Sequence, residues 1–87
     1  MIDLIFYRKS ELIMMRVLNG KVFFATPHLA QGQMYPIDMI GITEVSKLKV
    51  QAIKQRIAAA KTEDAIADIV IDDMEQDGFI LQHRKRF

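Results

Sequence analysis

Short apolar runs separated by turn residues dominate the first third of the chain. The stretch ELIMMRVLNGKVFFATP holds two such runs on either side of Asn19-Gly20. Asn-Gly accepts the positive φ angles of a type I′ turn, whose twist matches that of paired strands. The pattern predicts a β-hairpin of Leu12–Leu18 and Lys21–Thr26, which ends at Pro27 because proline donates no hydrogen bond to a sheet.

The segments on either side of this hairpin give weaker strand signals. IDLIFYR, residues 2–8, is apolar on both faces, which suits a central strand and also a short helix. Residues 28–36 form a predicted loop because Gly32 and Pro36 interrupt them. Ile37–Ile42 is a candidate fourth strand, although Gly41 weakens its strand character.

The second half of the chain has a helical pattern. Thr43 is placed to cap a helix whose body, EVSKLKVQAIKQRIAAAK, contains no glycine or proline. Thr62 is a second N-cap, and the helix that follows is expected to run to Gln76 before Asp77-Gly78 ends it. The short segment FILQH, residues 79–83, then predicts a last strand that returns to the sheet.

These elements predict an α+β fold in a single domain of residues 1–87. An antiparallel sheet of three to five strands is covered on one face by two antiparallel helices, in the order β-β-β-(β)-α-α-β. The apolar share of 51% is slightly high for a small monomer and suggests a buried partner surface, such as a homodimer interface. The methionines, among them Met14 and Met15, favour core packing over an adaptable binding surface.

Negative charge is concentrated between Glu63 and Asp77, where seven acidic side chains fall in a chain whose net charge is +1. At about 100° per residue, four of them share the side of the second helix that lies opposite its apolar face. Like charges four residues apart cost a few tenths of a kcal/mol per pair, so nearby cations should relieve this acidic stripe. The acidic stripe consists of Asp64, Asp68, Asp72 and Glu75.

Two sources of positive charge are available to neutralise the acidic stripe. One source lies within the chain: Lys49 and Arg56 of the first helix are placed to reach Asp68 or Asp73, and the tail HRKRF adds Arg84, Lys85 and Arg86. These contacts would leave a solvated and partly self-neutralised surface. The other source is a partner protein with a basic surface. Carboxylates four residues apart on a helix are separated by about 6 Å, so the stripe would imitate a run of nucleic-acid phosphates.

A nucleic acid is the alternative partner. It would be held by basic residues of the hairpin, the first helix and the C-terminal tail. The sequence pI of about 8.1 lies below the strongly basic range of dedicated nucleic-acid-binding domains, so a protein partner is favoured. The candidate residues for nucleic-acid binding are Arg16, Lys21, Lys47, Lys54, Lys61, Arg84, Lys85 and Arg86.

The sequence contains no motif that indicates catalysis or a cofactor. It has no cysteine, which excludes disulfides and thiolate metal sites. Residues 73–84, DMEQDGFILQHR, match a calcium loop in part, but Arg84 occupies the place of the bidentate glutamate. His28 and His83 lie far apart, and neither has a carboxylate at ligand spacing. We therefore expect no enzyme, no cofactor and no metal site, but an adaptor or inhibitor that binds a protein.

The cellular location is predicted from the absence of two patterns. The N-terminus, MIDLIFYRKS, lacks the basic leader and the uninterrupted apolar run of a secretory signal. No apolar stretch approaches the ~20 residues that a membrane helix needs. A cytoplasmic location without membrane contact is the resulting expectation.

Overall fold

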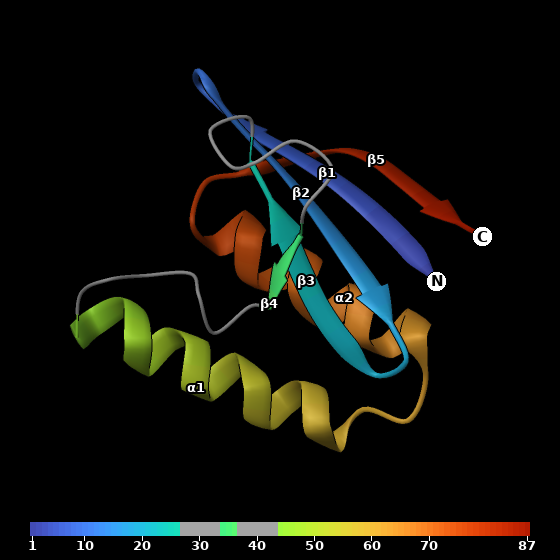
Figure 1. The fold of residues 1–87 in the computed structure, drawn as a ribbon. Coiled ribbons are helices and arrows are strands. Elements are labelled where there is room, and N and C mark those ends of the chain that lie inside the picture. Colours follow the sequence, from blue (N-terminus) through green and yellow to red (C-terminus); the bar gives the residue numbers. More distant parts are fainter. Residues whose placement is uncertain (27–33, 37–43) are drawn as a thin grey trace.

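The computed structural model describes residues 1–26, 34–36 and 44–87, with side chains placed for 1–26, 34 and 51–87. Five strands form one antiparallel sheet in the order β4-β3-β2-β1-β5, and two helices run in opposite directions beside it (Figure 1). The predicted α+β class and the order β-β-β-(β)-α-α-β are confirmed. The elements are β1 (Ile2–Arg8), β2 (Glu11–Leu18), β3 (Lys21–Ala25), β4 (Tyr35–Pro36), α1 (Glu44–Ala59), α2 (Glu63–Gln76) and β5 (Ile80–Arg86).

Two tight turns connect the first three strands. Asn19 and Gly20 join β2 to β3, and their φ angles of 52° and 77° are those that a type I′ turn requires. Lys9, with a φ of 54°, and Ser10 join β1 to β2 in a second two-residue turn. The predicted hairpin is confirmed, and its outer ends differ from the prediction by one residue each.

The fourth strand lies earlier in the chain than the sequence predicted. β4 is Tyr35–Pro36, which falls within the predicted loop of residues 28–36, and it pairs with the middle of β3. Pro36 is tolerated because β4 is the outermost of the described strands, where a missing backbone donor breaks no further pairing. The candidate strand Ile37–Ile42 lies outside the described residues.

Both helices form where the sequence predicted them. α1 spans most of the predicted helical body, and its expected cap lies outside the described residues. Thr62 caps α2, since its Oγ1 accepts a hydrogen bond of 3.1 Å from the backbone N–H of Ala65. At the other end, the N–H of Phe79 donates to the carbonyl of Met74 at 3.0 Å. Gly78 has the left-handed φ of 89° that this type of helix ending uses.

The last strand extends farther than predicted. β5 runs over Ile80–Arg86, whereas the sequence predicted a strand at 79–83 followed by a basic tail. Phe79 is buried in the core before the strand begins. The extension forms because residues 84–86 complete the antiparallel pairing with the N-terminal half of β1, and this pairing aligns Arg84 with Leu4.

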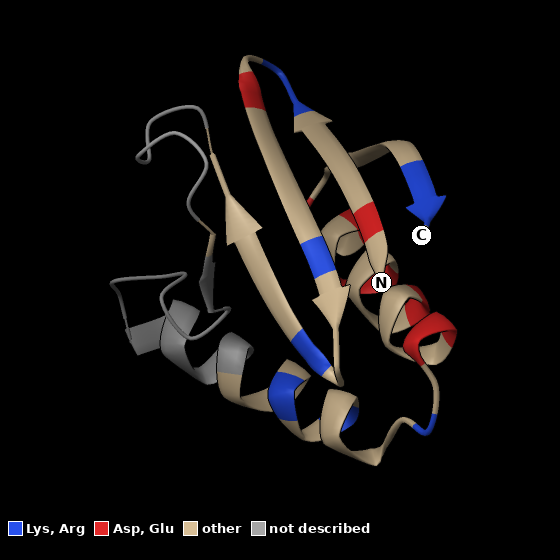
Figure 2. Cartoon of the chain, turned by 45° about the vertical axis from the view of Figure 1, so that its right-hand side comes forward, with Lys and Arg blue, Asp and Glu red and all other residues tan. Residues whose placement is uncertain are grey.

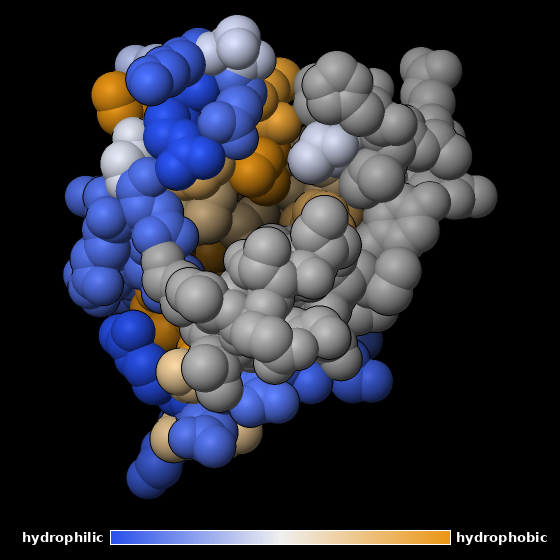
Figure 3. Space-filling view, turned by 90° about the vertical axis from the view of Figure 1, so that its left-hand side faces the viewer, coloured by the Kyte–Doolittle hydropathy of each residue, from blue (hydrophilic) through white to orange (hydrophobic). Residues whose placement is uncertain are grey.

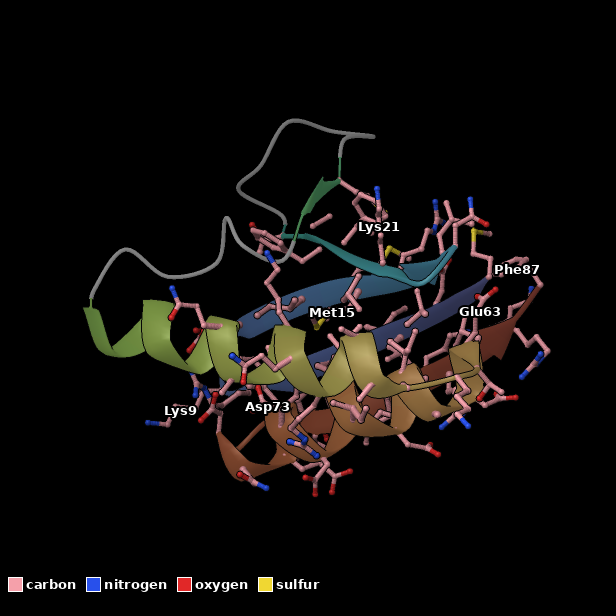
Figure 4. All side chains as sticks on the ribbon, turned by 90° about the horizontal axis from the view of Figure 1, so that it is seen from below. Lys9, Met15, Lys21, Glu63, Asp73 and Phe87 are labelled. Carbon is pink, nitrogen blue, oxygen red and sulfur yellow. The ribbon has the colours of Figure 1, made fainter. Side chains whose placement is uncertain are left out.

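Alternation along the strands places one face of the sheet against the helices. On β1, Ile2, Leu4 and Phe6 are buried, whereas Ile5 and Tyr7, which follow Leu4 and Phe6, point to the other face and are partly exposed. Figure 4 shows the buried side chain of Met15 between the sheet and the helices, so it packs in the core as expected. The core consists of Ile2, Leu4, Phe6, Met15, Val17, Val22, Ile53, Ile57, Ile66, Ala67, Val70, Met74 and Phe79.

Arg8 connects the end of β1 to the end of α2. Its Nη1 donates a hydrogen bond of 2.7 Å to the carbonyl of Asp77, and its guanidinium lies 4.2 Å from the centre of the Phe79 ring. Its Nη2 also lies 3.0 Å from Oε1 of Glu11. A cation is favourable at the negative end of a helix and over an aromatic face. Arg8 therefore stabilises the junction where the chain leaves α2 for β5.

We expect Arg8→Ala to lower the free energy of unfolding by about 1–3 kcal/mol, because a charge-assisted hydrogen bond and a ring contact are lost. Urea denaturation followed by circular dichroism measures the change. Lys9→Ala removes the same charge from the adjacent exposed residue and should change the free energy by less than ~0.5 kcal/mol. Equal effects of the two substitutions would contradict the role of Arg8.

Candidate functional site

The acidic stripe lies on the outer side of α2. The opposite side of the helix is apolar and buried in the core. Figure 2 shows the acidic positions on the outside of α2, turned away from the sheet. The predicted division of this helix into an apolar side and an acidic side is confirmed. All four carboxylates of the stripe are exposed, namely Asp64, Asp68, Asp72 and Glu75.

Two arginines of β5 reach across to the acidic stripe. Arg84 lies 2.8 Å from Asp68 and 3.2 Å from Asp64, and Arg86 forms a further ion pair with Asp64. Both side chains point to the helix side of the sheet because their register partners on β1, Leu4 and Ile2, are core residues. Two of the three tail residues that the sequence offered as cations for the stripe, Arg84 and Arg86, therefore neutralise its beginning.

The other end of the stripe is less fully paired. Arg56 of α1 lies 3.6 Å from Asp72, which also accepts a hydrogen bond of 3.1 Å from Gln76. The sequence placed Arg56 within reach of Asp68 or Asp73, whereas its ion pair is with Asp72, the residue before Asp73. The side chain of Lys49 lies outside the described residues. Glu75 is exposed and forms no ion pair within the described part of the chain.

These contacts lower the negative field of the acidic stripe. Exposed ion pairs of this kind contribute about 0.2–1 kcal/mol each and are screened by salt. Three guanidinium groups pair with three of the four carboxylates, so they offset most of the stripe's formal charge. A basic partner would therefore meet Asp72 and Glu75 first, and it would compete with Arg84 and Arg86 for the other two carboxylates.

The basic residues that were candidates for nucleic-acid binding come from β2, β3, α1, the segment between the helices and β5. The arginines among them are engaged with carboxylates, Arg16 with Asp3 and the two of β5 with α2. Lys85 Nζ lies 4.9 Å from the centre of the Phe87 ring. The side chain of Lys47 lies outside the described residues. The remaining candidates are exposed at separate places on β3, on α1 and between the helices, and they are Lys21, Lys54 and Lys61.

We name the side of the sheet that is turned away from the helices the open sheet face. The strand register arranges its side chains in rows that cross the strands. Directly paired residues place their side chains on the same face about 5 Å apart. Apolar side chains gather at the end near the β1–β2 turn, and charged ones follow toward the other end. The rows in that order are Ile80–Tyr7–Leu12, then His83–Ile5–Met14–Ala25, then Lys85–Asp3–Arg16–Phe23.

The first row is the main exposed apolar feature within the described residues. Ile80, Tyr7 and Leu12 are 53%, 38% and 45% exposed, and they are neighbours on three adjacent strands. Together with the half-buried Ile5 and Met14 of the next row they form a continuous surface, which we name the apolar patch. Figure 3 shows that apolar side chains also come to the surface between polar ones on the side drawn there. Contiguous exposed apolar side chains mark surfaces that contact other proteins.

The charged row beside the apolar patch is satisfied internally. Arg16 donates two hydrogen bonds, of 2.7 and 2.9 Å, to the two carboxylate oxygens of Asp3, which is only 5% exposed. The hydrogen bond to Asp3 raises the pKa of Arg16, desolvation opposes this in part, and the negative charge of Asp3 adds to the rise. Arg16 is therefore a partner of Asp3 rather than a free guanidinium on the surface.

The residues that the sequence offered for metal binding or acid–base chemistry lie as follows in the fold. The segment that partly matches a calcium loop forms the end of α2, the Gly78 turn and the start of β5. Within residues 1–26, 34–36 and 44–87, no three metal-ligating side chains cluster. His83 is exposed on β5, aligned with Ile5, and His28 lies outside the described residues. Neither described helix is long and apolar enough to cross a membrane.

Comparison with known proteins adds no functional assignment. No family model, curated protein or solved structure matches the chain. A functional proposal therefore depends on the surfaces of the molecule itself, which are the acidic stripe and the apolar patch.

The apolar patch was not among the residues predicted to bind a partner. Its members come from three strands, and the pairing of β5 with β1 that joins them cannot be read from periodicity. One signal was present in the sequence. IDLIFYR is apolar at both alternating sets of positions, and a strand with one face toward water would have been expected to show polar residues there.

Proposed function

We propose that this chain is a non-enzymatic protein-interaction module that binds through the apolar patch on its open sheet face. The observation that carries the proposal is the row formed by Ile80, Tyr7 and Leu12. These three large apolar side chains are about half exposed on three adjacent strands. Their contact with water is unfavourable, and burial under a partner lowers the free energy of the complex. The hydrogen-bonded pairing of β5, β1 and β2 holds these three side chains next to one another.

The composition of the patch favours a protein over a nucleic acid. Leu12, Ile80, Ile5 and Met14 are aliphatic or thioether side chains, which pack against other apolar side chains, whereas single-stranded nucleic acid is bound by stacking on aromatic rings. Only Tyr7 in the patch offers a ring. Arg16, Arg84 and Arg86, which form ion pairs with carboxylates, are also less available for phosphates than free arginines would be.

Catalysis is not part of the proposal. His83 is the described histidine, and it is exposed on an outer strand with no hydrogen-bond partner within the described residues. An acid–base pair needs a second group within hydrogen-bond reach. The role as an adaptor or inhibitor stays a prediction from the sequence. The cytoplasmic location also stays a prediction.

The acidic stripe is a second candidate surface, for a basic partner protein that recognises the stripe as it would a run of phosphates. Its support is the outward position of all four carboxylates and the lack of an ion pair at Glu75 in the described part of the chain. The contacts of Arg84 with Asp64 and Asp68 are an intramolecular version of the contacts that a basic partner would make. The same contacts weaken this candidate, because a partner must displace them.

Site-specific photo-cross-linking tests the main proposal. Leu12 is replaced by the photoreactive residue p-benzoylphenylalanine, and the protein is irradiated in its native host. We expect a covalent adduct with a protein, identified by mass spectrometry, because Leu12 is an exposed member of the apolar patch. The matched control carries the same residue in place of Gln51, which is exposed on α1 away from the sheet.

The outcome at Leu12 decides the proposal. Adducts formed equally at Gln51 would show that contacts at Leu12 are random encounters, and no protein adduct at Leu12 would contradict the proposal. An adduct with RNA or DNA instead of a protein would support the alternative, a nucleic-acid-binding protein.

Two charge-matched variants test the acidic stripe with a deca-arginine peptide as the probe. Asp68→Asn with Asp72→Asn and Gln51→Lys with Gln55→Lys change the net charge by the same amount. We expect the first pair to weaken peptide binding about three- to tenfold more than the second, since each local ion pair is worth about 0.2–1 kcal/mol. Isothermal titration calorimetry at low salt measures the affinities. Equal affinities of the two variants would show that only net charge matters and would remove the stripe as a site.

A further inference from the structure

The open sheet face carries positive charge beside the apolar patch. We propose that its occupant is an amphipathic helix of another protein, with apolar side chains over the apolar patch and acidic side chains over the neighbouring lysines. This inference rests on the proposed function, since it names the chemistry of the partner at the same surface.

Charge on the open sheet face is unbalanced. The third row holds Lys85, Asp3 and Arg16, and the next pair of residues along β2 and β3 is Leu18 with Lys21. Asp3 is the one carboxylate among the described strand residues of this face, and it is hidden and bound twice by Arg16. Three cations and one paired carboxylate leave an excess of two positive charges, which the exposed Lys21 and Lys85 present to solvent.

Both lysines point away from the helix layer. Lys21 precedes the buried Val22, so alternation turns its side chain to the open sheet face, and Figure 4 shows it on the side of the sheet away from α2. Lys85 pairs with Asp3 in the register of β5 with β1, so it shares that face. Within the described part of the chain, neither lysine forms an ion pair with a carboxylate. Both are therefore available to an acidic partner.

The carboxylates elsewhere in the molecule do not cancel this charge. The acidic stripe lies on the outer side of α2, so a helix about 10 Å in diameter and the sheet separate it from the two lysines. Exposed charges farther apart than about 8 Å are largely screened at physiological salt. At the other end of the patch, Glu11 pairs with Arg8, and the adjacent Lys9 adds positive charge. Acidic residues complement an apolar surface with such a border.

The open sheet face favours a helix over an extended segment. A sheet offers backbone hydrogen-bonding groups at its edges, whereas its face offers side chains. A partner segment that covers apolar side chains must therefore satisfy its own backbone groups, which a helix does and an extended segment does not. Helices on both faces of a sheet are also one of the stable layer arrangements of proteins, and α1 and α2 already cover the opposite face.

The rows define the pattern expected of this helix. Successive rows are about 6.8 Å apart, because every second residue of a strand faces the same side. The two apolar rows and the two rows that contain Lys85 and Lys21 extend over about 20 Å, which a helix covers in about 14 residues. Apolar residues over about two turns and acidic residues over the next two match the face. One helix covers less than the ~800 Å² per partner of a standard interface, so we expect micromolar or weaker binding.

Three synthetic helices serve as probes of this contact. Each has about 18 residues, with leucines on one side of its second half and alanine or glutamine at the remaining positions. They differ only at three positions on the same side of the first half, which are all glutamate, all glutamine or all lysine. Isothermal titration calorimetry with the whole chain measures the affinities, and NMR of the methyl groups of Leu12 and Ile80 locates the contact.

We expect the wild type to bind the glutamate helix about three- to tenfold more tightly than the glutamine helix, because exposed ion pairs contribute modestly. The lysine helix should bind most weakly, and all shifts should centre on Leu12 and Ile80. Lys21→Glu combined with Lys85→Glu should reverse this order, so that the lysine helix binds most tightly. Because the same helices are compared on both proteins, differences in their own helicity cancel.

Lys54→Glu combined with Lys61→Glu is the charge-matched control. Both lysines are exposed, on α1 and between the helices, away from the open sheet face. This variant should keep the order of the wild type, and circular dichroism should show that both double variants are folded. A reversal as complete as that of Lys21→Glu with Lys85→Glu would show that only net charge matters and would overturn the proposal.

Four other results would also overturn the acidic helix as the occupant. The wild type would bind none of the helices at 1 mM, or it would bind all three equally, or it would prefer the lysine helix. A twelve-nucleotide oligothymidylate would bind more tightly than the glutamate helix and shift the same methyl signals, which would indicate a nucleic acid. Shifts of Leu12 and Ile80 on concentrating the protein alone would indicate a second copy and would count equally against the proposal.

This inference and the proposed function fail in different ways. A protein adduct at Leu12 in the host, together with equal binding of the three helices, would overturn the acidic helix and leave the interaction module standing. Absence of an adduct at Leu12 in the host contradicts the proposed function, whichever helix binds most tightly.

Discussion

Burial of one alternating set of β1 side chains under α2 is the constraint on which the remaining structure depends. Ile2, Leu4 and Phe6 are almost completely hidden, and they meet the apolar side of α2 in the core. Because successive side chains of a strand point to opposite faces, this burial turns Ile5 and Tyr7 away from the helices. Both described helices lie on the same side, so the second face of the sheet keeps its apolar residues without a covering helix.

The same constraint determines where the charges meet. β5 aligns with β1, so the residues of β5 that pair with buried positions must also face the helix layer. Arg84 and Arg86 occupy those positions, and they find the carboxylates of α2 rather than solvent. On the other face, Asp3 and Arg16 are direct cross-strand neighbours and bind each other. The charges that the sequence separates along the chain are thus brought together by strand pairing.

The elements of this fold could be predicted largely from local signals. Asn19-Gly20 specifies its turn, Thr62 caps its helix, and Gly78 ends it, and each of these acts through hydrogen bonds or φ angles of neighbouring residues. The apolar and acidic sides of α2 follow from helical periodicity alone. The helical cap at Thr43 and the strand at Ile37–Ile42 lie outside the described residues.

The surfaces could not be predicted in the same way, because they depend on pairing between distant segments. The sequence offered the basic residues after His83 as cations for the acidic stripe, but only the register with β1 makes Arg84 the partner of Asp68. Likewise, nothing in the sequence near Ile80 predicts that this apolar residue is exposed. It joins the apolar patch only because strand pairing places it beside Tyr7. Long-range register is not encoded in the periodicity of any single segment.

The most direct test of the central claim is the accessibility of side-chain methyl groups to a soluble paramagnetic agent, measured by NMR. Leu4 and Leu12 lie on opposite faces of neighbouring strands and serve as an internal pair. One-sided covering predicts strong relaxation enhancement at Leu12 and Ile80 and almost none at Leu4 and Val70. Protection of Leu12 and Ile80 equal to that of Leu4 would show that both faces of the sheet are covered, and the account would be wrong.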